Sequence, residues 1–322
     1  MLRPLGLGEV LDRAVTLCVK NFVPLALIFI VYAIPYAVVQ YLATQDLAHV
    51  MSALSTVLQA QGKANGHPAR ADPGALAAAL SAAPRLNGWY PLLLALVFFV
   101  GPLPAAALIH ACAAYYFGRV STLAAAYRVA LARWLPLVGL NCLYFGAGLM
   151  LYALVILLSL ALVFALVFVT AALHGVGIAL AAIVGLAVAL AGAAFFIVAT
   201  LAVQISYFTC VLEGAGSVVA FARGIGRVFV GVGLVRSLLV GLAYATIGIG
   251  IAIVAVVGEA VIAAVSHSPV AGTVYSTVVR VATAAFTTAF IAIFYYDLRV
   301  REEGLDLQLD ADAAREPSPA TA

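Results

Sequence analysis

The chain has 322 residues, of which 66% are hydrophobic and 9% are charged, and its mean hydropathy is +1.17. A soluble domain carries about 25% charged residues, so this composition excludes a water-soluble fold. The formal net charge is +3 and the basic residues are dispersed, which argues against a nucleic-acid partner. The composition is that of a multi-pass membrane protein.

The gaps between charged residues predict an all-α membrane helix bundle with six transmembrane helices. A helix needs about 20 apolar residues to cross the hydrocarbon core, and each gap is long enough for one or more such helices. The predicted spans are residues 22–43, 89–117, 135–172, 178–212, 231–258 and 272–296.

One stretch of 79 residues between Arg133 and Glu213 contains no Asp, Glu, Lys or Arg. Its length allows two long spans or three short ones. The segment His174–Gly177 (HGVG) divides it almost equally, and two spans keep the basic clusters on either side of the stretch on the same face of the membrane. The positive-inside rule favours that arrangement.

With six spans, both termini lie on one side of the membrane. That side collects twelve Lys and Arg residues against four on the other, so we expect both termini in the cytoplasm. Arginine outnumbers lysine 14 to 2, which is typical of a GC-rich bacterial genome and indicates a bacterial inner membrane. The first 22 residues include Glu9, Asp12, Arg13 and Lys20 and show no signal-peptidase site, so we expect the first span to be retained.

Three cytoplasmic segments share a pattern of a short amphipathic helix followed by a span. The first runs from Leu7 to Leu25, the second from Ser121 to Leu137, and a weaker third begins at Glu213. Pro24 and Pro136 suit the first turn of the spans that follow. The pattern predicts a threefold repeat whose short helices lie in the lipid headgroup plane. The alternative is that any span with basic flanks shows this pattern.

The remaining segments are extramembrane. We expect residues 44–88 to form an exterior helical hairpin around a polar linker and residues 304–322 to form a mostly disordered cytoplasmic tail. Residues 1–303 then form a single membrane domain.

Three blocks of the sequence carry a family resemblance. They are RPLGLGEVLDRAVTLCVKNFVPL near the start, VLEGAGSVVAFARGIGRVF in the middle and FYYDLRVREEGLDLQL near the end. Together they resemble the bacterial glycerophosphoryl diester phosphodiesterase membrane-domain family. The resemblance implies a six-span membrane module that is sometimes fused to a soluble phosphodiesterase barrel.

The sequence predicts no catalytic, cofactor-binding or metal-binding residues. The His-Arg-Gly and Glu-x-Asp motifs that the resemblance associates with phosphodiesterase activity are absent, and so are G-x-S-x-G and P-loop motifs. The four cysteines show no CxxC or CxxxC spacing. We therefore expect a protein that is not an enzyme.

Two helix breaks near the membrane midplane predict a candidate cavity. Transporters place binding sites at such breaks, because proline frees a backbone carbonyl that a substrate can satisfy. The alternative is that the breaks are kinks that only curve the bundle. The candidate cavity residues are Tyr32, Pro35, Tyr36, Gln40, Gly101, Pro102 and Pro104.

Charged and polar residues within the spans are costly and need partners. Glu259, at the expected end of the fifth span, and Arg280, inside the sixth, are expected to form an intramembrane ion pair. A further polar set is expected to form hydrogen bonds between helices: His110, Asn141, Tyr144, Gln204 and Tyr207.

Because intramembrane charge is sparse, the sequence favours a non-catalytic membrane module that scaffolds or regulates a protein partner and contacts membrane lipids. The alternative is a transporter or lipid-handling protein for an uncharged or lipidic solute.

Overall fold

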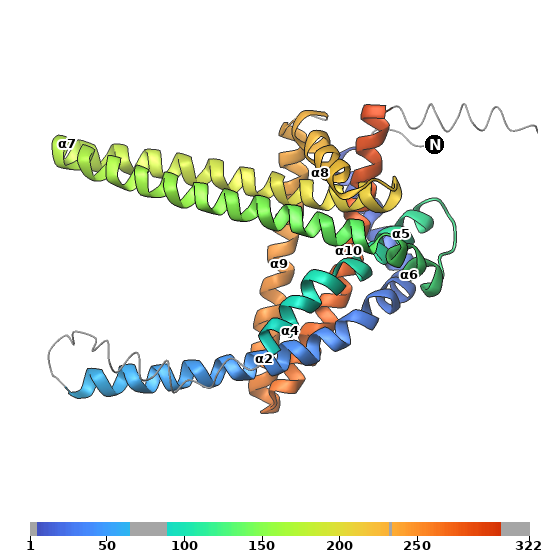
Figure 1. The fold of residues 1–322 in the computed structure, drawn as a ribbon, viewed down its shortest axis with the longest axis horizontal. Helices are drawn as coiled ribbons and strands as arrows, with labels where there is room; N and C mark the ends of the chain where they lie inside the picture. The colour runs from blue at the N-terminus through green and yellow to red at the C-terminus, as the bar shows by residue number, and fades with distance from the viewer. Residues whose placement is uncertain (1–4, 65–88, 232–233, 304–322) are drawn as a thin grey trace, which may run out of the picture. The chain divides into compact units, whose positions relative to one another are not determined.

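The computed structural model describes residues 5–64, 89–231 and 234–303, and throughout these ranges the regular structure is helical (Figure 1). Six helical segments are long and apolar enough to cross a membrane. The prediction of an all-α membrane bundle is therefore confirmed. These segments are Phe22–Gln45, Trp89–Tyr116, Trp134–Ala153, Ala182–Leu212, Leu234–Ser266 and Pro269–Glu302.

Short helices precede three of the long ones, at the places where the threefold pattern predicted them. Helix α1 (Leu7–Lys20) precedes α2 (Phe22–Ala64), and α6 (Leu123–Ala132) precedes α7 (Trp134–Leu212). Helix α8 (Ser217–Gly226) leads through the π-helical turn η2 (Arg227–Gly231) to α9 (Leu234–Ser266). Pro24 and Pro136 each fall third in their helix, where the missing N–H removes no helical hydrogen bond.

Helix α7 is one helical run of 79 residues that folds back on itself (Figure 1). The Tyr144 hydroxyl donates to the Ala202 carbonyl at 3.3 Å, although a straight helix would separate these residues by about 87 Å. The chain therefore reverses direction between them, and its two halves lie side by side. This confirms that the charge-free stretch supplies two spans. His174–Gly177, between these two spans, is itself helical.

Three predicted boundaries need correction. Helix α2 continues without a break to Ala64, so residues 44–64 extend the first helix and do not begin a separate hairpin. The helix can continue because no Pro or Gly interrupts the sequence between Pro35 and Gly62. Helix α9 continues past 258 to Ser266, and α10 (Pro269–Glu303) begins before 272. Residues 65–88 and 304–322, on which the rest of the hairpin and the disordered tail were predicted, lie outside the described ranges.

The second predicted span contains an irregularity at its centre. It consists of α4 (Trp89–Ala95), the π-helical turn η1 (Leu96–Val100) and α5 (Pro102–Tyr116). A Cβ atom on Gly101 would lie 2.4 Å from the Val97 carbonyl oxygen, so glycine is the residue that fits here. Pro102 then begins α5, where proline is tolerated.

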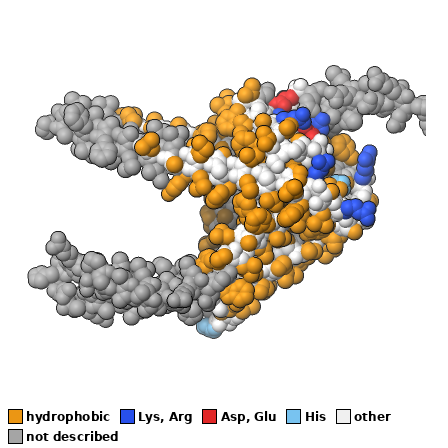
Figure 2. Space-filling model, viewed as in Figure 1, with side chains coloured by type: hydrophobic (Ala, Val, Ile, Leu, Met, Phe, Trp, Pro, Cys, Tyr) orange, Lys and Arg blue, Asp and Glu red, His pale blue; other side chains and the backbone are white. Residues whose placement is uncertain are grey.

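The fold divides into two compact units. Unit 1 comprises Met1–Ile28, Pro102–Ile253 and Ala282–Ala322, and unit 2 comprises Phe29–Gly101 and Val254–Val281. On the face drawn in Figure 2, hydrophobic side chains cover most of the described surface, and the visible Lys and Arg side chains gather at the end of unit 1 that carries α8 and the α5–α6 connection. This distribution suits helices whose apolar surfaces face hydrocarbon.

Candidate functional site

Unit 2 contains an arginine inside a membrane span. The Arg280 guanidinium, on α10, donates to Gln40 Oε1 at 3.0 Å and lies over the ring of Tyr36 with its central carbon 4.4 Å from the ring centroid. Tyr36 and Gln40 are one turn apart on α2, so their side chains share a face. The amide oxygen and the aromatic face thus both stabilise the cation.

Two more of the predicted cavity residues of unit 2, Tyr32 and Gly101, lie close to this contact. The Tyr32 ring lies 5.6 Å from the Tyr36 ring, and a Cβ atom on Gly101 would lie 3.4 Å from the Tyr32 hydroxyl. The structure therefore brings together Tyr32, Tyr36, Gln40 and Gly101. It adds Arg280, which the sequence had assigned to a different site.

The remaining predicted cavity residues are prolines. Pro35 lies inside α2, which continues through it. Pro102 and Pro104 are buried in the first turn of α5 and belong to unit 1.

Glu259 and Arg280 do not form an ion pair in the part of the chain that the structure describes. A Cβ atom on Gly272 would lie 2.8 Å from the Glu259 carbonyl oxygen, so Glu259 is level with Gly272 on the neighbouring helix. Arg280 is eight residues further along α10, or about 12 Å at 1.5 Å per residue. The antiparallel register of the two helices therefore separates the charges.

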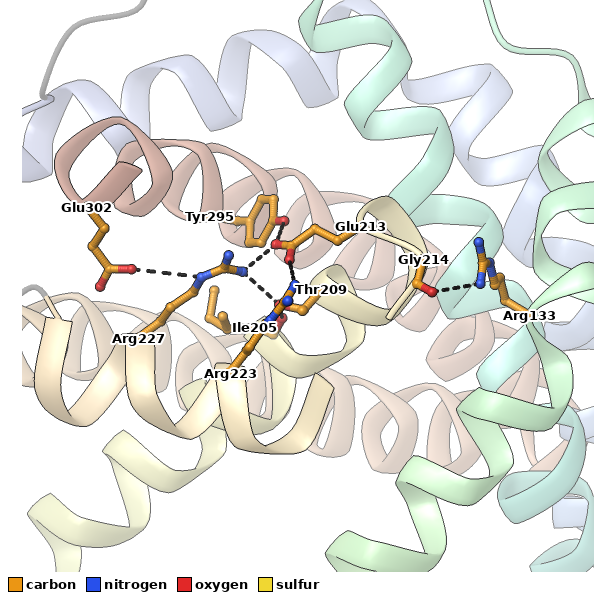
Figure 3. Close-up of polar contacts among 9 residues, drawn as sticks. All are labelled: Arg133, Ile205, Thr209, Glu213, Gly214, Arg223, Arg227, Tyr295 and Glu302. Atoms are coloured by element: carbon orange, nitrogen blue, oxygen red, sulfur yellow. Dashed lines mark hydrogen bonds and ion pairs between the residues drawn. The ribbon is translucent and has the colours of Figure 1, made fainter. Parts of the chain in front are cut away.

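Unit 1 contains a network of charged side chains around Glu213, which directly follows α7 (Figure 3). Arg223 Nη1 donates to Glu213 Oε2 at 2.9 Å, and Arg227 Nη1 and the Tyr295 hydroxyl both donate to Oε1. Arg227 also donates to Thr209 Oγ1 at 2.9 Å. The network ties the last turn of α8 and the start of η2 to the end of α7 and to α10.

Burial and charge act in opposite directions on Glu213. Burial alone raises the pKa of its carboxyl group. Hydrogen bonds from Arg227, Tyr295 and Arg223 and the charge of Arg227 lower the pKa by more than burial raises it, so the pKa lies below its ordinary value of 4.5. Glu213 is therefore ionised at neutral pH and serves as the fixed negative centre of the network.

The turn after Glu213 depends on glycine. Gly214 has a φ of +71°, and a Cβ atom there would lie 2.5 Å from Arg133 Nη2. Arg133 Nη1 donates to the Gly214 carbonyl at 2.9 Å. The start of α7 is thus joined to its end through one backbone carbonyl.

A second charged network surrounds Asp297, whose side chain is 0% exposed. It accepts from the Leu5 backbone N–H at 2.7 Å, from Arg236 Nη2 at 2.6 Å and from Arg301 Nε at 3.1 Å. The same two arginines donate to the Leu5 carbonyl at 2.7 and 3.0 Å. The segment before α1 is therefore fixed to the beginning of α9 and the end of α10.

The sequence located these charges at helix ends but did not connect them. Charges at helix ends, such as Glu213, Arg223 and Asp297, indicate either salt bridging or compensation of the helix dipole, and the structure contains an Arg223–Glu213 ion pair. The roles of Leu5 and Tyr295 were missed. A backbone N–H carries no sequence signal, and Tyr295 reads equally well as part of an aromatic belt.

Three residues of the predicted polar set, Asn141, Tyr144 and Tyr207, form hydrogen bonds across the hairpin of α7, whereas His110 and Gln204 form no side-chain hydrogen bond within the described ranges. The Tyr207 hydroxyl donates to Asn141 Oδ1, and the Tyr144 and Ser206 hydroxyls lie 2.5 Å apart. His110 lines a cavity of about 390 Å³ together with Arg119 and Ser121. Among the described residues, no group of three or more His, Cys, Asp or Glu side chains could hold a metal ion.

Comparison with known proteins found no matching family model, no matching curated protein and no matching solved structure.

Proposed function

We propose that this chain is a non-catalytic, multi-pass module of a bacterial inner membrane that scaffolds or regulates a membrane partner. It contacts lipid through α1, α6 and α8, and both of its termini are cytoplasmic. The observation that carries the proposal is the arrangement of side chains on α1.

Helix α1 has three sectors. One is buried in unit 1, one is exposed and apolar, and one is polar. Their members are Val10, Ala14, Leu17 and Cys18 for the buried sector, Leu7, Leu11, Val15 and Val19 for the exposed apolar sector, and Glu9, Asp12, Arg13, Thr16 and Lys20 for the polar sector. A helix that packs on protein, inserts an apolar stripe into lipid and keeps cations beside it suits the headgroup plane.

The other two short helices have comparable surfaces. Leu123 and Leu131 on α6 and Val218 and Val219 on α8 are exposed, while Ala126, Ala130 and Ala220 are buried. Helix α6 directly precedes a span and α8 precedes one through η2, so their exposed apolar side chains lie at the level of the membrane boundary. Lipid contact explains why these side chains are not buried in protein.

The two charged networks support a structural role for Glu213 and Asp297. Glu213 and Asp297 each accept hydrogen bonds from two arginines. Such pairs hold α1, α8, α9 and α10 in one arrangement. A fixed platform of this kind suits a module that presents surfaces to a partner.

We also propose that the chain is a relative of the glycerophosphoryl diester phosphodiesterase membrane-domain family. The support is that the three resembling blocks coincide with α1, with the α7–α8–η2 connection and with the end of α10. The twelve-to-four distribution of cations supports cytoplasmic termini.

A second candidate function is the handling of an uncharged or lipidic solute. The specific observation in its favour is the Arg280–Gln40–Tyr36 contact. Polar and charged groups inside a span are costly, so they often mark a functional site. This site belongs to unit 2, next to the break at η1.

A photo-crosslinking amino acid on α1 tests the proposed lipid contact. It is placed at Val15, in the exposed apolar sector, and at Thr16 as the matched control, because Thr16 is also exposed but lies in the polar sector. We expect phospholipid adducts from Val15 and few from Thr16. Equal labelling would remove the lipid-facing assignment of α1.

Reconstitution separates the two candidate functions. Purified protein in liposomes should not move fluorescent lipid or neutral solutes across the bilayer faster than empty liposomes if it is a scaffold. Flux that disappears on Tyr36→Phe would favour the second candidate.

A further inference from the structure

A cavity of about 340 Å³ lies between the polar sector of α1 and the last turn of α5, within unit 1. The side chains that matter here are Asp12, Arg13, Thr16 and Lys20 from α1 and Tyr115 and Tyr116 from α5. Its volume is within the range of small-ligand sites.

The cavity lies at the membrane boundary. Helix α1 ends at Lys20, directly before the span that begins at Phe22, and Tyr116 ends the span that begins at Trp89. Two span ends and a pair of tyrosines therefore place the cavity at the depth of lipid headgroups, where tyrosine is enriched.

The residues that line the cavity are held in place by hydrogen bonds and by one ring contact. The Tyr115 hydroxyl donates to the Ser121 carbonyl at 3.0 Å, and the Tyr116 ring stacks on Tyr296 with centroids 5.1 Å apart and planes 8° from parallel. Asn21, which also lines the cavity, donates to the Leu17 carbonyl at 3.0 Å. A preformed wall lowers the entropy cost of binding.

The charges in this cavity differ from those in the two networks. Within the described ranges, Arg13 and Lys20 have neither a hydrogen bond nor an ion pair through their side chains, whereas Arg227 and Arg236 are paired with carboxylates. Two cations and the Asp12 carboxylate give the cavity a net charge of +1. A phosphodiester carries one negative charge and accepts hydrogen bonds from both kinds of cation.

We infer that this cavity binds the phosphodiester headgroup of an anionic phospholipid such as phosphatidylglycerol. Arg13 and Lys20 contact the phosphate, and Asp12 and Thr16 accept hydrogen bonds from headgroup hydroxyls. The exposed apolar sector of α1 adjoins the polar sector, so the acyl chains have an apolar surface beside the cavity. The inference rests on the proposed lipid contact of α1 and adds the headgroup class that it selects.

The test uses the purified full chain in detergent micelles and measures lipid binding by native mass spectrometry. The probes are phosphatidylglycerol, phosphatidylcholine and phosphatidylethanolamine with identical acyl chains, and inorganic phosphate. We expect phosphatidylglycerol to bind at least about tenfold more tightly than the two zwitterionic lipids. Arg13→Gln and Lys20→Gln should each weaken its binding about fivefold, the effect of one basic residue near an anionic headgroup.

Two variants control for general electrostatics and for folding. Arg128→Gln removes an exposed cation from α6, outside the cavity, and should change phosphatidylglycerol binding less than twofold. Arg13→Lys keeps the charge and should retain most of the binding. The thermal midpoint of each variant without added lipid verifies that it is folded.

The outcomes separate this inference from the proposed function. The headgroup site is overturned if all three lipids bind equally, or if Arg128→Gln weakens phosphatidylglycerol binding as much as the cavity variants do. Lipid adducts at Val15 would in that case still support the lipid contact of α1. If inorganic phosphate displaces bound phosphatidylglycerol as effectively as added phosphatidylglycerol does, the cavity binds a soluble phosphate and the inference of a lipid headgroup site is overturned. Absence of both retained lipid and Val15 adducts would overturn the proposed function itself.

Discussion

Asp297 offers the sharpest test of how the helices of unit 1 are held together. Its side chain is 0% exposed and accepts from the Leu5 backbone and from two arginines. Asp297→Asn keeps the size of the side chain but removes its charge, so Arg236 and Arg301 lose their counter-ion. Breaking a buried pair costs about 3–5 kcal/mol.

The structure places the expected loss near the lower end of that range. The side chains of Arg236 and Arg301 are 25% and 31% exposed, so water can hydrate both guanidinium groups after the substitution. We therefore expect the free energy of unfolding to fall by about 3 kcal/mol, measured by reversible unfolding in mixed micelles. Hydrogen exchange at the Leu5 amide should also accelerate, because that N–H loses a charged acceptor.

Asp12→Asn is the matched control, since it makes the same chemical change at an exposed position. It should alter stability by no more than about 0.5 kcal/mol. If Asp297→Asn is as stable as this control, and exchange at Leu5 is unchanged, the carboxylate does not hold the segment before α1 and the reasoning is wrong.

Three further outcomes are expected. Because the pKa of Glu213 in the folded state lies below 4.5, its ionised carboxylate stabilises the fold fully above pH 4.5, and this stabilisation is lost as the pH falls through the folded pKa. Glu213→Gln should therefore make the free energy of unfolding depend less on pH in this acidic range. Glu259→Gln and Arg280→Gln should have additive effects on unfolding within about 0.5 kcal/mol, whereas a strong coupling would mean that the two charges meet. Single cysteines at Ala64 and Ser318 in intact cells should react with an impermeant maleimide at 64 and not at 318, and the opposite pattern would invert the topology.

The number of spans could be predicted from the sequence because it depends on local properties. Inside hydrocarbon every backbone N–H and C=O must be bonded within its own segment, so a long apolar run has little choice but to form a helix. The charge gaps therefore located six spans. The spacing of Tyr32, Tyr36 and Gln40 likewise predicted a shared face, because helical periodicity is set by the backbone alone.

The partners of the charged residues could be found only in the tertiary structure. Arg280 contacts Gln40 from 240 residues away, and Leu5 contacts Asp297 from 292 residues away. Which residues meet depends on the rotation and register of each helix against its neighbours. Helices that are apolar on every side, such as α7 and α9, have no hydrophobic stripe that would fix their rotation or register. Close packing and hydrogen bonding between the helices decide both.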